Sequence, residues 1–142
     1  MWTGRPQSLA EAAAVTVDDR WFALNELMDE FYLNDRDLRT QQTMIDQAPA
    51  VTDSPFIDAF YAATAEHLAL RWQLDIPVWT EEPRRAGSNR PTFMPNIPAI
   101  WPILLVESPY AFRQRHIFTG REPLQRARWP LREVKVPPLC DL

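Results

Sequence analysis

Glycine is scarce in this sequence, with three residues in 142 at the distant positions 4, 87 and 120. A loop that cradles phosphate groups with backbone N–H groups needs clustered glycines, so this class of nucleotide site is excluded. Cysteine is scarcer still, because Cys140 has no second cysteine in the sequence with which to form a disulfide. We therefore expect a reducing compartment and a cytoplasmic protein.

Long apolar runs are also missing. The longest, residues 100–106, is interrupted by Pro102. A membrane span needs about 20 predominantly apolar residues, so we expect no insertion into a membrane. Residues 1–5 carry no apolar stretch, and we expect no secretory signal there.

The length and composition are those of an ordinary globular domain, with 46% apolar residues in a chain of 142. Such a chain can bury a core without disulfides or a structural metal. We expect a single domain over residues 1–142, divided into a helical body at 8–73, a connector at 74–99, a motif-bearing segment at 100–128 and a proline-containing tail at 129–142.

Charge is divided unevenly along the chain. Residues 1–108 contain 8 basic and 16 acidic residues, a net charge of −8, whereas residues 109–142 contain 7 basic and 3 acidic residues, a net charge of +4. This asymmetry either steers a charged partner or lets the two parts of the chain attract each other. The sequence leaves both interpretations open.

Start signals and apolar spacing predict helices in the body. Ser8 and Glu11 have the capping-box spacing, which predicts a helix over residues 9–15. A longer helix follows to about residue 33, capped by Asp18 or Thr16. Weaker spacing predicts a helix over residues 37–48.

A further start signal, Asp53-Ser54-Pro55, predicts a helix over residues 55–73, because proline fits the first helical position. Apolar residues on this helix and on the helix ending near residue 33 recur at three- and four-residue steps, which predicts one shared core. Its expected members are Trp21, Leu24, Phe31, Ile57, Phe60, Leu68 and Trp72.

The second half of the chain is less regular. The connector at residues 74–99 has five prolines and no helical period, so it is either pinned by Trp79, Phe93 and Met94 or mobile. The apolar run at residues 100–106 is interpreted as a buried helical turn or a short strand.

Two more start signals predict short helices in the motif-bearing segment. Ser108-Pro109 predicts a helix to about Arg115, and a capping box at Thr119 predicts one to about Arg128. The expected fold is therefore mainly α, a single irregular helical domain with a long Pro-rich connector and short C-terminal helices.

His67 does not complete a metal-binding motif. A zinc-protease helix needs a second histidine four residues away, but Ala63 and Arg71 occupy those positions. We expect His67 to be a helical surface or semi-buried residue, and we expect no metal and no cofactor.

His116 is the other titratable candidate. No carboxylate or nucleophile is linked to it by spacing, so we expect the protein not to be an enzyme. The competing interpretation is a small hydrolase or nuclease in which His116 works with a carboxylate brought close by folding, with Glu107 the nearest candidate.

Residues 107–118, ESPYAFRQRHIF, combine arginines with aromatic and aliphatic residues. Arginine beside aromatic anchors is typical of the residues that dominate protein interfaces. The expected partner-binding residues are Tyr110, Phe112, Arg113, Arg115, His116, Phe118, Arg121 and Arg126. Two alternatives stay open: Phe112 and Phe118 only dock a short helix, or the arginines form a strip for nucleic acid.

The chain also resembles a poorly characterised actinobacterial family. The shared motifs are AEHLA at residues 65–69, PVWTEEP at 77–83, ESPYAFRQRHIF at 107–118 and LQRA at 124–127. In relatives this C-terminal module often follows a helix-turn-helix domain, and their genes lie beside nucleotidyltransferase-like toxins. Residues 1–51 here do not have a DNA-binding pattern, so the resemblance chiefly implies binding to a protein.

Taken together, these patterns predict a non-enzymatic protein-binding component, antitoxin-like, whose basic C-terminal segment binds a toxin-like enzyme. A nucleic-acid-binding regulator is the alternative, and association into a homo-oligomer is left open.

Overall fold

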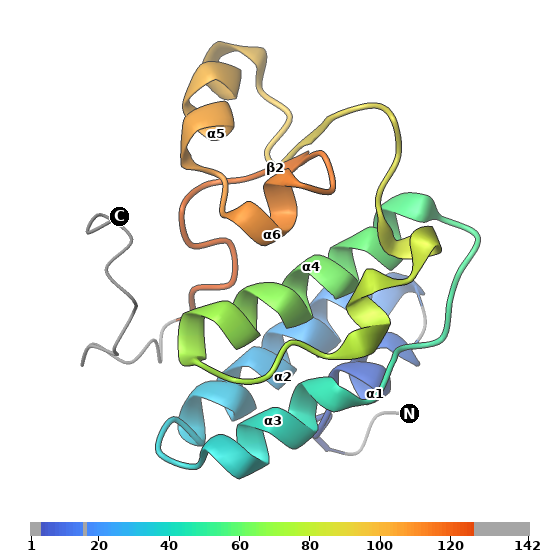
Figure 1. The fold of residues 1–142 in the computed structure, drawn as a ribbon, viewed down its shortest axis with the longest axis vertical. Coiled ribbons are helices and arrows are strands. Elements are labelled where there is room, and N and C mark those ends of the chain that lie inside the picture. The colour runs from blue at the N-terminus through green and yellow to red at the C-terminus, as the bar shows by residue number, and fades with distance from the viewer. Residues whose placement is uncertain (1–3, 16, 127–142) are drawn as a thin grey trace. The chain divides into compact units, whose positions relative to one another are not determined.

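A computed structural model describes residues 4–15 and 17–126 of the chain (Figure 1). The fold is mostly helical with one small sheet, which confirms the mainly α prediction. The proline-containing tail, Cys140 and the expected helix end at Arg128 lie outside the described residues. The contacts within the chain divide it into two compact units, which we describe separately.

The described residues of the first unit are 4–15, 17–50, 68–77 and 124–126. Its helices are α1 (Leu9–Ala13), a 3-10 turn η1 (Val17–Asp19), α2 (Arg20–Leu33), α3 (Leu38–Asp46) and the C-terminal end of α4 (Pro55–Trp72).

Side-chain oxygens cap the N-terminal ends of α1 and α3. The Ser8 hydroxyl accepts the N–H of Glu11, as the capping box requires, and Asp37 accepts the N–H of Thr40 at the start of α3. The expected cap Asp18 is wrong, because it lies within η1 and the residue at the N-cap of α2 is Asp19, whose side chain makes no cap hydrogen bond. Thr16, the alternative, lies outside the described residues.

The core of the first unit contains four residues that the sequence predicts. Leu24, Phe31, Leu68 and Trp72 are buried, and the rings of Phe31 and Trp72 meet edge to face with centroids 6.0 Å apart. Trp21 was expected in this core, but 43% of it is exposed. It lies in the first turn of α2, and a helix end is covered by fewer neighbouring residues than the middle.

The second unit consists of residues 51–67 and 78–123. It begins with the N-terminal part of α4, where Ser54 Oγ accepts the N–H of Ile57 and helix formation starts at Pro55 as predicted. Phe60 is buried in this unit, as expected, whereas Ile57 is only half-buried.

The rest of the second unit is a series of short elements. They are the 3-10 turns η2 (Val78–Glu81), η3 (Pro83–Arg85) and η4 (Pro98–Ile100), the helices α5 (Trp101–Glu107) and α6 (Tyr110–Arg113), and the strands β1 (Thr92–Phe93) and β2 (Ile117–Phe118). The connector is therefore built from turns and one strand.

The two strands pair in parallel, with Thr92 opposite Ile117 and Phe93 opposite Phe118. The N–H of Thr92 donates to the carbonyl of His116, and the N–H of Met94 donates to the carbonyl of Phe118. The connector is anchored at this point, and at Trp79, whose side chain is buried. Helices α5 and α6 both pack against β2 (Figure 1).

One predicted helix is wrong, because residues 119–126 contain none. Thr119 does not cap, since its hydroxyl donates to the Gly120 carbonyl while its N–H donates to Ser108 Oγ. Pro123 also restricts Glu122, the residue before it, away from the helical region.

A second correction concerns Ser108. Its expected role was to cap the helix that follows, but its φ of −56° and ψ of 131° place it at the C-terminal end of α5. The proline after it favours this extended conformation. Helix α6 then ends early, at Arg113, and His116 has a φ of 62°.

Candidate partner-binding surface

Arg115 lies inside the second unit, although the sequence predicted it at an interface. Its Nη1 donates to Glu66 Oε1 at 2.7 Å, and the side chains of the pair are 6% and 11% exposed. A buried charge requires such a partner, because desolvation costs several kcal/mol for each ion.

Three more N–H groups of the Arg115 guanidinium donate to backbone carbonyls. Nε donates to Arg85 at 3.0 Å, Nη1 to Ala111 at 2.7 Å and Nη2 to Thr80 at 3.0 Å. One side chain thus joins α4, the turns η2 and η3, and α6. The planar guanidinium suits this role because it presents several donors in fixed directions.

Arg85 is also buried, and its guanidinium carbon lies 4.7 Å from the centroid of the Trp79 ring. Its Nε pairs with Glu82 at 3.3 Å, and its Nη1 donates to the Asp58 carbonyl at 3.4 Å. This placement could not be predicted from the sequence, because Arg85 has the same charge as its exposed neighbour Arg84.

Gly87 and His116 lie in two segments that meet next to Arg115. Gly87 has a φ of 94°, and a Cβ there would collide with the backbone carbonyl of Arg115. His116 is exposed, and its Nδ1 lies 2.7 Å from the Ser88 carbonyl. Its ring therefore ties β2 to the turn containing Gly87.

Phe112 and Phe118, two aromatic residues of the motif, pack inside the second unit. Phe112 is fully buried and meets Phe60 with ring centroids 5.6 Å apart. Phe118 is half-buried and stacks on Phe93 at 5.3 Å, while Phe93 stacks on Trp101 at 4.3 Å. These contacts match the alternative in which Phe112 and Phe118 dock the short helix.

Of the eight expected partner-binding residues, four are exposed: Tyr110, Arg113, His116 and Arg121. Tyr110 is 63% exposed. Arg113 Nη2 donates to the carbonyls of Val106 at 3.0 Å and Ser108 at 2.8 Å, so it caps the C-terminal end of α5.

Arg121 has a side-chain exposure of 77% and lies 3.8 Å from the Glu107 carboxylate. An exposed pair at this distance contributes at most about 1 kcal/mol. The Arg121 side chain therefore keeps most of its freedom to meet another molecule.

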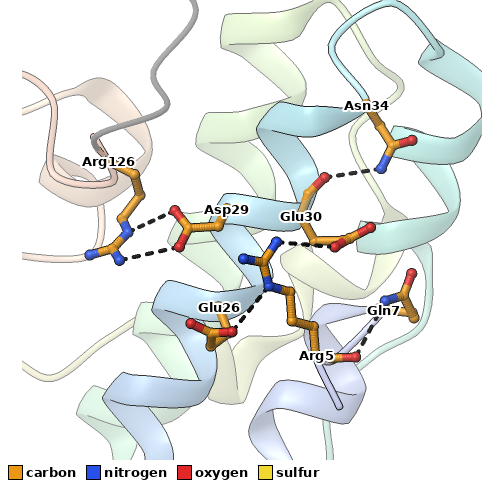
Figure 2. A network of polar contacts seen from close by, with 7 residues as sticks. All are labelled: Arg5, Gln7, Glu26, Asp29, Glu30, Asn34 and Arg126. Carbon is orange, nitrogen blue, oxygen red and sulfur yellow. Dashed lines mark hydrogen bonds and ion pairs between the residues drawn. The ribbon is translucent and has the colours of Figure 1, made fainter.

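Arg126 belongs to the first unit, where it pairs with Asp29 on α2. Its Nε and Nη2 donate to the two carboxylate oxygens at 3.0 and 3.3 Å, and these hydrogen bonds raise the pKa of Arg126 (Figure 2). Figure 2 also shows Arg5 pairing with Glu26 and Glu30 on the same helix.

The two parts of the chain with opposite charge thus meet within each unit, in the pairs Arg115–Glu66 and Arg126–Asp29. For these two arginines, the internal interpretation of the charge asymmetry is confirmed. Phosphate contacts by either residue would compete with a carboxylate already in place.

Helix α5 exposes an apolar face that the sequence interpretation missed. Leu104 is its buried residue, whereas Ile103, Leu105 and Val106 are exposed, Val106 by 77%. A signal was present, because all of Ile103, Leu104, Leu105 and Val106 are apolar and a short helix on a surface buries only one side.

Tyr110 and Arg113 lie next to this face. They are three residues apart on α6, which places them side by side on a helix, and Arg113 is bonded to the last turn of α5. We call Ile103, Leu105, Val106, Tyr110 and Arg113 the α5 surface.

Metal-ligating side chains and long apolar helices were sought in the described part of the chain. Residues 4–15 and 17–126 hold no cluster of three metal-ligating side chains. None of the helices described is long and apolar enough to cross a membrane.

We compared the chain with known protein families, curated proteins and solved structures. No protein-family model, no curated protein and no solved structure matches the chain. The resemblance to the actinobacterial family therefore stays a prediction.

Proposed function

We propose that the protein is a non-enzymatic protein-binding component that associates with another protein through the α5 surface. The observation that carries the proposal is the exposure of Ile103, Leu105 and Val106 on one short helix. Contiguous apolar side chains on a surface, bordered by polar groups, are typical of interaction sites.

Tyr110 and Arg113 strengthen this proposal, because tyrosine and arginine are enriched among the residues that dominate binding energy. Two carbonyls already hold the Arg113 side chain, so Arg113 would lose little side-chain entropy on binding a partner. With Arg121 nearby in sequence and exposed, the border of the surface favours a partner that offers carboxylates.

The partner that the family resemblance implies is a toxin-like enzyme of the nucleotidyltransferase kind, which would make this protein antitoxin-like. A role without catalysis is supported by His116, whose Nδ1 meets a backbone carbonyl in an exposed turn. A base in a hydrolase would instead be expected near a carboxylate or a nucleophile.

The test is affinity purification from the native host with three forms of the full chain. Ile103→Glu with Val106→Glu places charges on the α5 surface, and Val78→Glu is the matched control on another exposed aliphatic residue. We expect the wild-type chain and the control to recover the same protein and the double variant to lose it.

Undiminished recovery with the double variant would remove the α5 surface from the proposal. Recovery of nucleic acid alone, with strong dependence on salt, would replace protein binding by the nucleic-acid alternative. Circular dichroism of each variant establishes that the fold is kept.

A further inference from the structure

Residues 91–106 contain no charged side chain, although Leu104 is the only buried residue among them. Charged residues make up 24% of the chain, so a stretch of this length would ordinarily hold about four. The exposed apolar side chains of the α5 surface, Ile103, Leu105 and Val106, come from this stretch. The charged residues follow it in sequence, from Glu107 onward.

An uncharged apolar surface is compatible with a second copy of itself. In a two-fold symmetric dimer each residue beside the axis faces its own equivalent, so a charge there would meet a like charge. Val106 carries no charge, and 77% of it is exposed. The chain thus meets the first requirement for pairing across a two-fold axis at Val106.

Two groups of opposite charge lie next to Val106. Glu107 is the following residue, and Arg121 Nη2 lies 3.8 Å from its carboxylate while 77% of the Arg121 side chain is exposed. An exposed pair of this kind contributes little within one chain. Across a two-fold axis at Val106, Arg121 of each copy can meet Glu107 of the other, so the border of the surface supplies complementary charges.

Arg113 adds little repulsion to this arrangement. Its Nη2 already donates to the carbonyls of Val106 and Ser108 at 3.0 and 2.8 Å, so the C-terminal end of α5 offsets part of its charge. Tyr110 is 63% exposed three residues earlier and adds an aromatic ring to the same border.

The α5 surface is too small for a permanent dimer. A stable interface buries about 800 Å² and 20–30 residues on each partner, whereas the α5 surface has five residues, several of them only partly exposed. We therefore expect weak association that depends on concentration, with a dissociation constant of about 10–100 µM.

We propose that the free protein forms a weak two-fold symmetric dimer in which the α5 surfaces of two copies face each other at Val106. This dimer covers the surface that binds the partner, so self-association and partner binding exclude each other. In this second step the inference rests on the proposed function.

Sedimentation velocity of the full chain, at concentrations below and above the expected dissociation constant, measures the association. We expect the wild-type chain and the control Val78→Glu to change from monomer to dimer, and Ile103→Glu with Val106→Glu to stay monomeric. A wild-type chain that is always monomeric, or a double variant that dimerises as well as the wild type, would overturn the inference.

An exchange of charges tests the border separately from the apolar centre. Arg121→Glu and Glu107→Arg each place like charges on both sides of the interface, so each alone should raise the dissociation constant about threefold or more. An equimolar mixture of the two variants should associate more tightly than either variant alone, because every contact across the interface then joins opposite charges. A mixture that associates no more tightly would contradict the assigned contacts, since an effect within one chain is not reversed by mixing.

A disulfide tests the position of the axis. In a Cys140→Ser background, Val106→Cys should oxidise to a covalent dimer, because residues beside the axis lie within the roughly 7 Å between Cα atoms that a disulfide can span. Val78→Cys is the matched control at an aliphatic residue that is 85% exposed, and it should oxidise much more slowly. Equal rates would contradict an axis at Val106.

The same covalent dimer tests the exclusion of the partner. Oxidised Val106→Cys should fail to recover the partner from the native host, and reduction should restore recovery. Recovery by the oxidised dimer would refute the exclusion. A chain that never self-associates but loses its partner with Ile103→Glu and Val106→Glu would reject the dimer and leave the proposed function standing, whereas a dimer whose disruption leaves partner recovery intact would reject the proposed function of the surface alone.

Discussion

Glu66 and Arg115 form an ion pair with an N–O distance of 2.7 Å in the interior of the second unit. Gln114 Nε2 donates to the same Glu66 oxygen at 2.7 Å, so the carboxylate is held from two sides. Because Arg115 also binds three carbonyls, the pair connects segments that are far apart in sequence. Its removal should therefore affect the whole unit.

Arg115→Ala should lower the free energy of unfolding by about 3–5 kcal/mol, since it leaves Glu66 buried without its cation. Urea denaturation measures the change. The matched control is Arg121→Ala, at an arginine that is mostly exposed, for which we expect a change within about 0.5 kcal/mol. Equal effects of the two substitutions would contradict the structural role of Arg115.

Gly87→Ala should destabilise the protein by more than about 1 kcal/mol. The positive φ of 94° alone costs an L-residue about 1–2 kcal/mol, and the new Cβ would meet the Arg115 carbonyl. Gly120→Ala is the matched control, because no atom lies within 4 Å of its added Cβ. Thermal denaturation of both variants measures this difference. Equally small losses of stability in the two variants would contradict the prediction.

Phe60→Ala should cost about 3–5 kcal/mol, because Phe60 is buried and meets the ring of Phe112. Phe22→Ala removes the same side chain from a position that is 58% exposed and should cost much less. Chemical denaturation compares them, and a larger loss at Phe22 would show that the assigned core is wrong.

Asp37 should make α3 sensitive to acid. Hydrogen bonds from the Thr40 hydroxyl and then from the Thr40 N–H lower the pKa of the Asp37 carboxyl. A lowered folded pKa means that this stabilisation is present above the unfolded pKa and is lost as pH falls through the folded value.

NMR titration of the Asp37 carboxyl and the Thr40 amide checks this expectation. The pKa of the carboxyl should lie below the ordinary aspartate value of about 3.8, and the Thr40 amide signal should move with it. Asp37→Asn keeps an acceptor at the cap but cannot ionise, so its Thr40 signal should lack that transition. A pKa at or above the ordinary aspartate value in the wild-type chain would contradict the cap.

The parts of the fold that follow local rules were predictable from sequence. Starts at Ser8 and Pro55 rest on a side-chain acceptor or on proline within a few residues, and the structure confirms them. Leu24, Phe31 and Trp72 were predicted in the core from apolar spacing, which reports the buried face of a long helix.

The failures arise where distant residues decide the outcome. Thr119 has the local pattern of a cap, but its backbone N–H donates to the hydroxyl of Ser108, eleven positions earlier. Arg115 looks like an interface residue until Glu66, 49 positions earlier, is seen to neutralise it. Arginines bonded to distant carbonyls are indistinguishable in sequence from solvated ones, so the burial of Arg115 could not be predicted from the sequence.

The anchoring of Arg115 has a consequence for anyone handling the motif by itself. Residues 107–118 form a contiguous stretch of sequence, yet Arg115 depends on oxygen atoms of Glu66, Thr80 and Arg85. A synthetic fragment of that stretch would expose a cation and a phenylalanine that the intact chain keeps hidden. It would therefore display a recognition epitope different from the native one, and an antibody or binder raised against it would select for the wrong face.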